Sequence, residues 1–527
     1  MTIEDLAPAA AASEAALAAG TADAYDLGIA ALARGLAGRE GEAEDLFNKA
    51  VALQPDDPSP LVFLAIWRRE QGQLRDSALA CDRAIALAPG YADAWLERGA
   101  TLAAGGSAAA ARASFEQAAR LAPHSARAHA GIASIAAREG DRLAANEHAR
   151  TALGIEPGNA VARNALASLA LEDGRADDVP GLLDPVVATL PASVERSQAR
   201  SLLGQAATRA GSIEAAYEHF RHANEDYVTL TARAAAGSIN QYDFIAAIDA
   251  GLAAALPAWG PPLPPRIIAA AAPRHVFLLG YPRSGTTLLE NVLASLPGVE
   301  ALEERPTFAE LDSVLLSGDA GAVSRGVQAF ALWGEDRLAG AARGYWQHVH
   351  NAGISTSAET FLDMDPLKGT RLPFIARMFP DARVIVLRRD PRDVVWSCFR
   401  TNFAVTSNTL EFTSLERVAR HYDALMRLTD RALQNLPIAA LEVDYQRLVR
   451  EFDTVTHEIC AFTGLEWSEN LRRFDRTAQE RGVGTASATQ VRRGLYDGSG
   501  QWRPFAEYFE PIMPILAPWI ARFGSGD

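Results

Sequence analysis

The sequence predicts two parts of different fold class, an all-α right-handed solenoid followed by an α/β domain with a parallel sheet. Residue types recur every 34 positions between residues 24 and 191, and a period of this length is typical of stacked helical repeats. Further along, an apolar segment leads through a glycine-containing turn into a helical segment at 275–296. A second apolar segment leads into an arginine-rich turn and another helical segment at 383–400. Such strand–turn–helix units are typical of sheets covered by helices on both faces.

Composition places the chain among ordinary globular proteins. Its 527 residues suffice for two to four domains, and 49% hydrophobic with 22% charged residues excludes a wholly disordered chain. A net charge of −15 argues against general nucleic-acid binding, which needs a basic face. Cys81, Cys398 and Cys460 lie far apart, which excludes a disulfide framework and a cysteine zinc site and fits a reducing compartment.

The sequence also shows no sign of membrane insertion or export. Residues 1–20 carry acidic residues where a signal peptide needs basic ones. No uninterrupted apolar stretch reaches the length of about 18 residues that a membrane-spanning helix requires. We therefore expect a soluble, cytoplasmic protein. No His/Cys/Asp cluster has ligand spacing, so no metal is expected.

The 34-residue period is carried by prolines, glycines and alanines. They recur at Pro55, Pro89, Pro123, Pro157 and Pro191, at Gly38, Gly72, Gly106, Gly140 and Gly174, and at Ala50, Ala84, Ala118 and Ala152. The proline ends the second helix of each unit, and the glycine lies in the turn between its two helices. A helix–turn–helix unit of this period resembles the tetratricopeptide repeat (TPR).

About five repeats cover residues 24–191, and residues 195–225 read as one further, irregular helical pair. We therefore expect an N-terminal extension (1–23), a TPR solenoid (24–225), a helical and proline-rich linker (226–272) and a C-terminal domain (273–527). A stacked array offers a concave groove. It serves either as a rigid spacer or dimerisation arm, with a homodimer as one outcome, or as the binding site for a peptide or partner protein.

The first motif of the C-terminal domain is a phosphate-binding loop. The apolar segment 275–280 reads as a strand, YPRSGTT follows at 281–287, and 288–296 has helical spacing. In such a P-loop-like unit the backbone N–H groups and the helix N-terminus face an anion. Gly280 and Gly285 stand five residues apart, as in a Walker A loop, but Thr286 takes the place of its lysine. This disfavours a nucleotide kinase or hydrolase and leaves Arg283 as the cation of the turn.

The second motif follows the predicted strand 383–387. Arg388, Arg389, Arg392 and Arg400 crowd one strand-to-helix junction, and Ser397 lies two turns into the helix. A solvated, salt-bridged helix start would explain this cluster. The density of arginines in an acidic protein favours a second anion site instead.

Together, PRSGTT and the later strand–RRDPRD–helix–Ser pattern are similar to the sulfotransferase superfamily over roughly 273–527. The resemblance implies the donor 3′-phosphoadenosine-5′-phosphosulfate (PAPS), the product adenosine 3′,5′-bisphosphate, and in-line transfer without a metal. It implies that Arg389 and Ser397 hold the 3′-phosphate. It also implies that the 5′-phosphosulfate is held by Arg283, Ser284, Gly285, Thr286 and Thr287.

Within the superfamily, the chain resembles the tyrosylprotein sulfotransferases and their bacterial relatives with TPR repeats. That branch has a carboxylate pair after the first helix, and Glu304, 21 residues after Arg283, matches its catalytic base. A carboxylate can take the proton of an attacking hydroxyl, and Arg283 can stabilise the charge of the leaving phosphate. Glu303 is an alternative base. A histidine such as His348 is another, because cytosolic small-molecule sulfotransferases use a histidine, and a solvated pair of loop carboxylates without a base role is the remaining interpretation.

The resemblance extends to two further positions and fails at two others. Tyr445 matches a tyrosine near the nucleotide, and Ser487 takes the place of a serine near the sulfuryl group. Met364 stands where the branch has a catalytic lysine before Asp-Pro, with Lys368 four residues on. Gln501 stands where a lysine precedes the C-terminal tryptophan. Each departure removes a cation from the expected phosphosulfate site.

Two functions from different classes follow. The leading hypothesis is PAPS-dependent sulfuryl transfer to a hydroxyl acceptor. One candidate acceptor is a tyrosine of a peptide held by the TPR groove, because tethering raises its local concentration. The alternative is a TPR scaffold whose C-terminal domain binds PAPS with little or no activity, and Met364 and Gln501 favour it.

Overall fold

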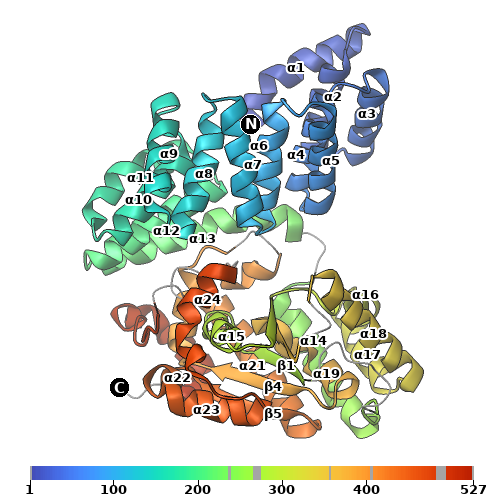
Figure 1. Cartoon of the computed structure of the whole chain (residues 1–527), viewed down its shortest axis with the longest axis vertical. Helices are drawn as coiled ribbons and strands as arrows, with labels where there is room; N and C mark the ends of the chain where they lie inside the picture. Colours follow the sequence, from blue (N-terminus) through green and yellow to red (C-terminus); the bar gives the residue numbers. More distant parts are fainter. Residues whose placement is uncertain are drawn as a thin grey trace. The chain divides into compact units, whose positions relative to one another are not determined.

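The computed structural model describes residues 3–235, 239–264, 274–354, 358–403, 407–481 and 494–524. The chain forms two compact units, Met1–Leu190 and Pro191–Asp527 (Figure 1). Within the described ranges, no helix combines the length and the apolar character needed to cross a membrane.

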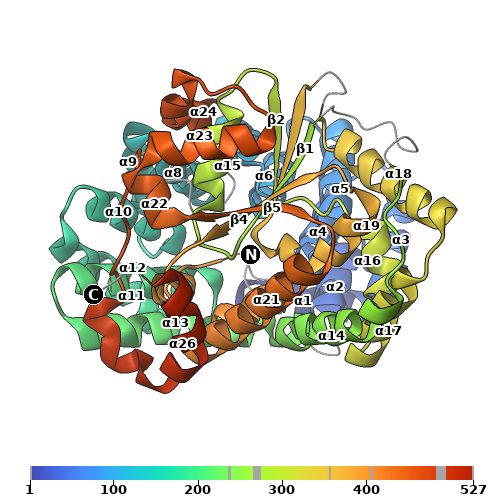
Figure 2. The ribbon, with the colours of Figure 1, turned by 90° about the horizontal axis from the view of Figure 1, so that it is seen from below.

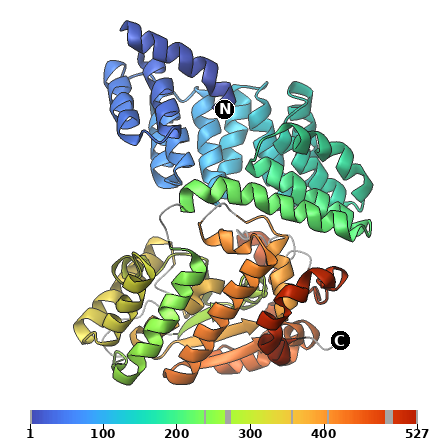
Figure 3. The same ribbon diagram turned by 180° about the vertical axis from the view of Figure 1, so that it is seen from behind.

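Unit 1 consists of helices that follow one another in antiparallel pairs (Figure 3). They are α1 (Ile3–Ala19), α2 (Ala24–Leu36), α3 (Glu40–Leu53), α4 (Ser59–Glu70), α5 (Leu74–Leu87), α6 (Ala92–Ala104), α7 (Ala108–Leu121), α8 (Ala126–Glu139), α9 (Arg142–Ile155), α10 (Ala160–Glu172) and α11 (Val179–Thr189), with a 3₁₀ turn η1 (Ala176–Asp178) before α11.

The periodic residues lie where the repeat pattern predicts. The five glycines follow the first helix of each pair with φ between 73° and 82°, a conformation that glycine adopts without steric cost. Each periodic proline lies two residues after the second helix of its pair. Small residues allow close packing: a Cβ atom at Gly99 would lie 2.7 Å from the Phe115 ring, and one at Gly131 would lie 2.8 Å from it. The predicted helical repeat array is confirmed.

Unit 2 contains a five-stranded parallel sheet with the order β2-β3-β1-β4-β5. Its strands are β1 (Arg274–Leu279), β2 (Val299–Glu303), β3 (Thr360–Met364), β4 (Arg383–Arg388) and β5 (Ala439–Asp444). In the register, Leu278 of β1 lies beside Met364 of β3 and Ile385 of β4. The prediction of an α/β domain on a parallel sheet is confirmed.

Helices cover both faces of this sheet (Figure 2). The helices of unit 2 are α12 (Val194–Arg209), α13 (Ile213–Ala235), α14 (Gln241–Ala255), α15 (Thr286–Ala294), α16 (Ala309–Leu315), α17 (Ala320–Ala331), α18 (Glu335–Asn351), α19 (Leu372–Met378), α20 (Pro391–Phe399), α21 (Leu415–Asn435), α22 (Tyr445–Arg450), α23 (Phe452–Thr463), α24 (Phe474–Arg481) and α26 (Met513–Phe523). The 3₁₀ segments are η2 (Leu256–Ala258), η4 (Pro366–Arg371), η5 (Ser407–Phe412), η6 (Glu469–Arg473) and η7 (Arg503–Ile512).

Alternate residues of each strand point to opposite faces and enter two separate apolar clusters. Phe277 and Val384 pack with α14 and α17–α21, whereas Leu278 and Ile385 pack with α15 and α22–α24. The buried sheet positions α15 and α20 after the carboxyl ends of β1 and β4, the edge at which open parallel sheets bind ligands.

Helices α12 and α13, which the repeat pattern places at the end of the array, lie in unit 2. Ala216 and Phe220 of α13 belong to the same buried cluster as the sheet residues. The division between the two compact units falls between residues 190 and 191 of the chain. The domain ranges expected from the sequence, 1–23, 24–225, 226–272 and 273–527, stay predictions.

Candidate functional site

The loop between β1 and α15 needs glycine at two positions. Gly285 has φ +104° immediately before α15, and a Cβ atom there would collide with the Tyr445 ring. A Cβ atom at Gly280 would lie 2.9 Å from the Leu387 carbonyl oxygen. Gly285, the N-cap residue of α15, has no side chain to cap the first turn, so the backbone N–H groups there form a cradle suited to an anion.

The hydroxyl residues of this loop are buried. Ser284, Thr286 and Thr287 have 1%, 3% and 4% of their surface exposed. The Ser284 hydroxyl accepts a hydrogen bond from the Tyr281 backbone N–H at 3.3 Å. Ser284 therefore stabilises the turn in addition to lining it.

Arg283 joins the two sequence motifs. Its Nε donates to the Ser397 hydroxyl on α20 at 3.0 Å, and its carbonyl oxygen accepts a hydrogen bond from Arg389 at 2.9 Å. Desolvation by burial lowers the pKa of Arg283, and the nearby charge of Arg389 acts in the same direction. A bound anion would relieve this cost, because two guanidinium groups that repel each other would share one negative partner.

Two of the four clustered arginines pair with carboxylates instead of facing the loop. Arg388 is buried and binds Asp430 at 2.9 Å and Glu442 at 3.1 Å. Arg392 binds Asp390 at 2.8 Å and lies 4.3 Å from the centre of the Trp502 ring. Arg388 thus connects the end of β4 to α21 and β5, and Arg392 stabilises the start of α20.

Arg389 is held by protein groups but keeps one unused donor. One of its terminal nitrogens donates to the Gly498 carbonyl oxygen at 2.7 Å, and the guanidinium carbon lies 4.7 Å from the centre of the Tyr445 ring. Among the described residues, the buried Arg389 Nε has no hydrogen-bond partner. The Tyr445 hydroxyl donates to the Tyr496 carbonyl oxygen at 2.9 Å, so residues 496–498 cover this side of the site.

Arg400 belongs to the arginine cluster of the second motif, but the sequence assigned it no individual role. It follows α20 directly, and its guanidinium donates to the side-chain oxygen of Gln501. Burial lowers the pKa of Arg400 to about 10, with the charges of Arg283 and Arg389 acting in the same direction. Gln501 also donates to the Tyr496 hydroxyl at 2.9 Å. Gln501, at the position of an expected lysine, thus orients an arginine. The position of Arg400, three residues after Ser397, is the sequence signal that could have indicated this role.

Glu304 follows β2 in a strained conformation, with φ +47°. Its backbone N–H donates to the Met364 carbonyl oxygen at 2.8 Å, which fixes the turn to the end of β3. Water reaches the side chain, yet desolvation by the surrounding protein raises its pKa to about 8, with the charges of Asp365, Glu303 and Glu290 acting in the same direction. A carboxyl group that titrates near neutral pH is suited to general acid–base chemistry.

Met364 and Lys368 lie in different environments from each other. The Met364 side chain is fully buried in the apolar cluster beside α15. Lys368 is buried too, but it forms an ion pair with Asp363 and donates to the Thr307 hydroxyl at 3.2 Å. Asp363 also accepts a hydrogen bond from the Tyr345 hydroxyl at 2.7 Å. Lys368, the lysine nearest to Met364 in the sequence, is therefore part of a buried polar network.

Two further candidates remain, His348 and Ser487. His348 lies on α18, where its Nε2 is 3.8 Å from a Glu310 carboxyl oxygen. Ser487 lies outside the described residues. The structure thus brings together Arg283, Ser397, Arg389 and Tyr445 around the start of α15, and the charge of Glu304 acts on Arg283.

Comparison with known proteins gives the family of this region. Residues 273–469 match the model of the sulfotransferase family. The chain is 31% identical over 248 residues to an uncharacterized protein of Aquifex aeolicus (strain VF5), covering 46% of this chain and 32% of the relative. It is 22% identical over 264 residues to protein-tyrosine sulfotransferase 2 of Gallus gallus, covering 48% and 64%. The chain spans less than two thirds of the length of both relatives.

Solved structures similar to parts of the chain are helical repeat proteins. A TPR protein of Thermus thermophilus, TTC0263, has a TM-score of 0.29 and 23% identity, covering 33% of this chain and 98% of that protein. The Cut9–Hcn1 complex has a TM-score of 0.36 and 14% identity, covering 42% and 45%. Residues 273–469 thus match the sulfotransferase family, and the N-terminal half consists of the helical repeats described above.

Proposed function

We propose that this protein is a PAPS-dependent sulfotransferase that transfers a sulfuryl group to a hydroxyl acceptor. The observation that carries this proposal is the convergence of Arg283, Arg389 and Ser397 at the open N-terminus of α15. These groups offer backbone donors and two guanidinium groups in one place. A ligand with two separate phosphate groups is the kind of molecule that such an arrangement binds.

The residues present fit the donor. The loop from Gly280 to Thr287 would hold the phosphosulfate, and Arg389 with Ser397 would hold the 3′-phosphate, beside Tyr445. The buried Arg389 Nε, which has no partner among the described residues, is a donor available to that phosphate. When bound, PAPS supplies a sulfuryl group already activated on a phosphate leaving group.

The chain supplies a base and positive charge. Glu304 accepts the proton of the acceptor hydroxyl, and its pKa of about 8 lets it exchange a proton near neutral pH. Arg283 and Arg400 place positive charge where negative charge develops at the phosphate loop. Arg400, oriented by Gln501, provides a cation in a region where two expected lysines are absent.

A tyrosine in a peptide or protein is the acceptor that we propose, with the repeat array as its holder. The name of the Gallus gallus relative supports this acceptor class. Unit 1 contains a hollow of about 780 Å³ that includes Leu143, Arg150, Leu166, Leu169 and Leu182 in its lining. Leu143 is 85% exposed, so an apolar side chain of a peptide would gain burial there.

A second function is favoured by the two substituted lysines. Met364 is buried in the apolar core and Gln501 is uncharged, so neither adds a cation. In this alternative, the repeats bind a partner and the C-terminal domain binds PAPS with little or no turnover. The two functions differ in turnover and agree in donor binding.

Titration calorimetry of the full chain with adenosine 3′,5′-bisphosphate tests the shared step. We expect micromolar binding, and Arg389→Ala should weaken it by about tenfold or more, since hydrogen bonds to charged groups contribute about 1.5–3 kcal/mol. Arg447→Ala is the matched control, because Arg447 lies exposed on α22 and pairs with Glu458. Absence of binding by the folded wild-type chain would reject the proposal. Transfer of a labelled sulfuryl group from PAPS to a tyrosine peptide then distinguishes the two functions, because an enzyme transfers the label and a scaffold does not.

A further inference from the structure

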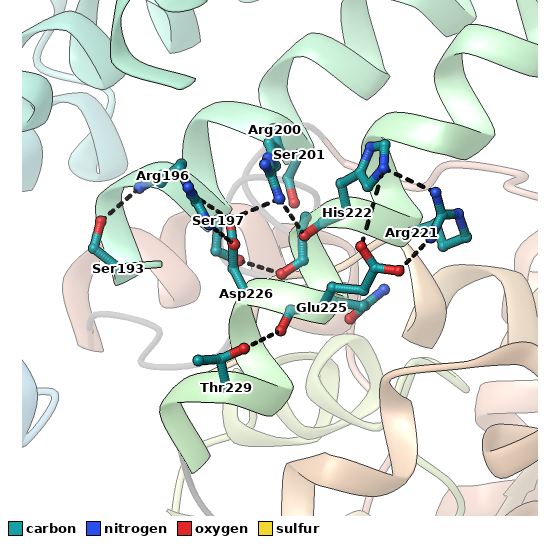
Figure 4. A network of polar contacts seen from close by, with 12 residues as sticks. Ser193, Arg196, Ser197, Arg200, Ser201, Arg221, His222, Glu225, Asp226 and Thr229 are labelled. Atoms are coloured by element: carbon teal, nitrogen blue, oxygen red, sulfur yellow. Dashed lines mark hydrogen bonds and ion pairs between the residues drawn. The ribbon is translucent and has the colours of Figure 1, made fainter. Parts of the chain in front are cut away.

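Helices α12 and α13 form a rigid pair clamped by one buried carboxylate. Asp226 of α13 pairs with two residues of α12: Arg196 donates a hydrogen bond to it through Nε at 3.0 Å, and Arg200 forms an ion pair with it, with a nitrogen 3.1 Å from a carboxylate oxygen. Arg200 also donates to the His222 carbonyl oxygen at 2.8 Å, as Figure 4 shows. Asp226 is only 2% exposed, and burial of a paired charge fixes the geometry of its partners.

Polar side chains of this pair reach the chain that follows α20. The Asn224 amide donates to the carbonyl oxygen of Phe399 at 2.8 Å and to that of Phe220, within its own helix, at 3.0 Å. The Ser201 hydroxyl donates to the Asn402 side-chain oxygen at 2.9 Å. The pair therefore holds the chain on both sides of Arg400.

Aromatic contacts hold the same region from the apolar side. Phe220 packs edge-to-face against Trp396, with ring centres 5.7 Å apart. Tyr217 stacks on Phe399 at 5.5 Å. Phe220 and Trp396 are each 1% exposed, so α13 and α20 share a fully buried contact that tolerates little displacement.

The contact between α13 and the end of α20 affects the site because Ser397 and Arg400 lie at this end. Phe399 is its last residue, and the final carbonyl groups of a helix lack partners within the helix. Asn224 supplies one such partner. Ser397, two residues earlier, receives the Arg283 hydrogen bond, and Arg400 follows the helix directly. A shift of this end would move both groups.

We propose that the α12–α13 pair is a positioning element of the phosphate site, with Asn224 and Ser201 as its positioning residues. The pair sets the end of α20 so that Ser397 and Arg400 face the loop before α15. This inference rests on the proposed function in that the site it positions is the bisphosphate site. It assigns a task within the sulfotransferase unit to residues that read as the last helical repeat.

Bisphosphate affinity of full-chain variants gives the first test. Asn224→Ala should weaken adenosine 3′,5′-bisphosphate binding about fivefold, the range of one neutral hydrogen bond. Asn435→Ala is matched to it, because among the described residues Asn435 donates only to the carbonyl oxygen four residues earlier in α21, at 2.8 Å. That control should stay within about twofold of the wild type. Equal affinities for both variants would overturn the positioning role.

Hydrogen exchange of the unliganded chain gives the second test and separates the two proposals. In Asn224→Ala and in the milder Ser201→Ala, amides of 396–403 should exchange about fivefold faster, while amides of 286–294 keep their wild-type rates. Unchanged exchange at 396–403 would overturn this inference whatever the ligand result. If the wild type binds no bisphosphate while exchange responds as expected, the proposed function fails and the mechanical link stands.

Discussion

Arg283 donates a hydrogen bond from Nε to the Ser397 hydroxyl at 3.0 Å, across 114 residues of sequence. This bond connects the loop after β1 to the helix after β4. The two strands are neighbours in the sheet, so the loops that follow them meet at one edge. Under the proposed function, Arg283, Ser397 and Arg389 would therefore bind both phosphate groups of a bisphosphate as one hydrogen-bonded set.

Removal of the hydroxyl group at 397 should weaken donor binding. Ser397→Ala leaves the Arg283 Nε without this acceptor and removes one ligand of the expected 3′-phosphate. We expect adenosine 3′,5′-bisphosphate to bind about tenfold more weakly, as for a hydrogen bond with a charged group. Calorimetry measures this, and Ser313→Ala, which removes an exposed hydroxyl on α16, is the control. Unaltered affinity in Ser397→Ala would separate α20 from the ligand site.

Loss of the carboxylate at 304 should affect turnover and leave binding intact. Glu304→Gln keeps the size of the side chain but cannot accept the acceptor proton, so the transfer rate should fall about 100-fold or more. Affinity for adenosine 3′,5′-bisphosphate should stay near the wild-type value. Glu303→Gln is the matched control and should retain transfer. The opposite pattern, with Glu303→Gln inactive and Glu304→Gln active, would move the base to Glu303.

The pH dependence of transfer should reflect the raised pKa of Glu304. The base acts when deprotonated, so the rate should rise with pH and level off above about 8, the value to which burial and neighbouring carboxylates raise this pKa. A rate profile between about pH 6 and 9.5 measures it, because this range brackets the titration of a base with that pKa. A plateau already reached at the acidic end of the range would contradict a base with this pKa.

The raised pKa of Glu304 should also make the free energy of unfolding depend on pH. The folded chain holds the Glu304 proton up to about pH 8, whereas the unfolded chain releases it near the ordinary glutamate pKa of 4.5. The free energy of unfolding should therefore decrease as pH rises through this window. Glu304→Gln should remove that part of the slope. Urea unfolding at several pH values measures both chains, and identical slopes would show that the carboxyl group titrates normally.

Local patterns in the sequence were enough to predict the helical repeats and the two loop–helix units, because periodicity and strand–turn–helix spacing involve neighbouring residues. Contacts between distant segments could not be predicted in this way. The pairing of Arg400 with Gln501 spans 101 residues, and no local pattern marks it. Helices α12 and α13 have repeat-like spacing, and the pattern of apolar residues on a helix does not indicate which domain it packs against. The sequence therefore could not predict that they belong to unit 2. The burial of Asp363 depends on which sheet face it points to, and that of Lys368, in η4, on its ion pair with Asp363.

The ion pair between Lys368 and Asp363 should contribute to folding, with no direct part in donor binding. Both side chains are at most 3% exposed. Lys368→Met would leave the buried Asp363 carboxylate without its cation, and breaking one half of a buried pair costs about 3–5 kcal/mol. Urea unfolding should show that loss, while bisphosphate affinity measured under folding conditions stays near wild type.

The double variant Lys368→Met/Asp363→Leu separates pairing from packing. Because it removes both charges, it should recover most of the stability lost in Lys368→Met, since apolar residues often replace a buried pair at little net cost. The Lys49→Met substitution, at an exposed position in α3, controls for loss of a lysine as such. If Lys368→Met instead abolished bisphosphate binding while the free energy of unfolding stayed unchanged, Lys368 would be the cation that replaces the lysine missing at Met364.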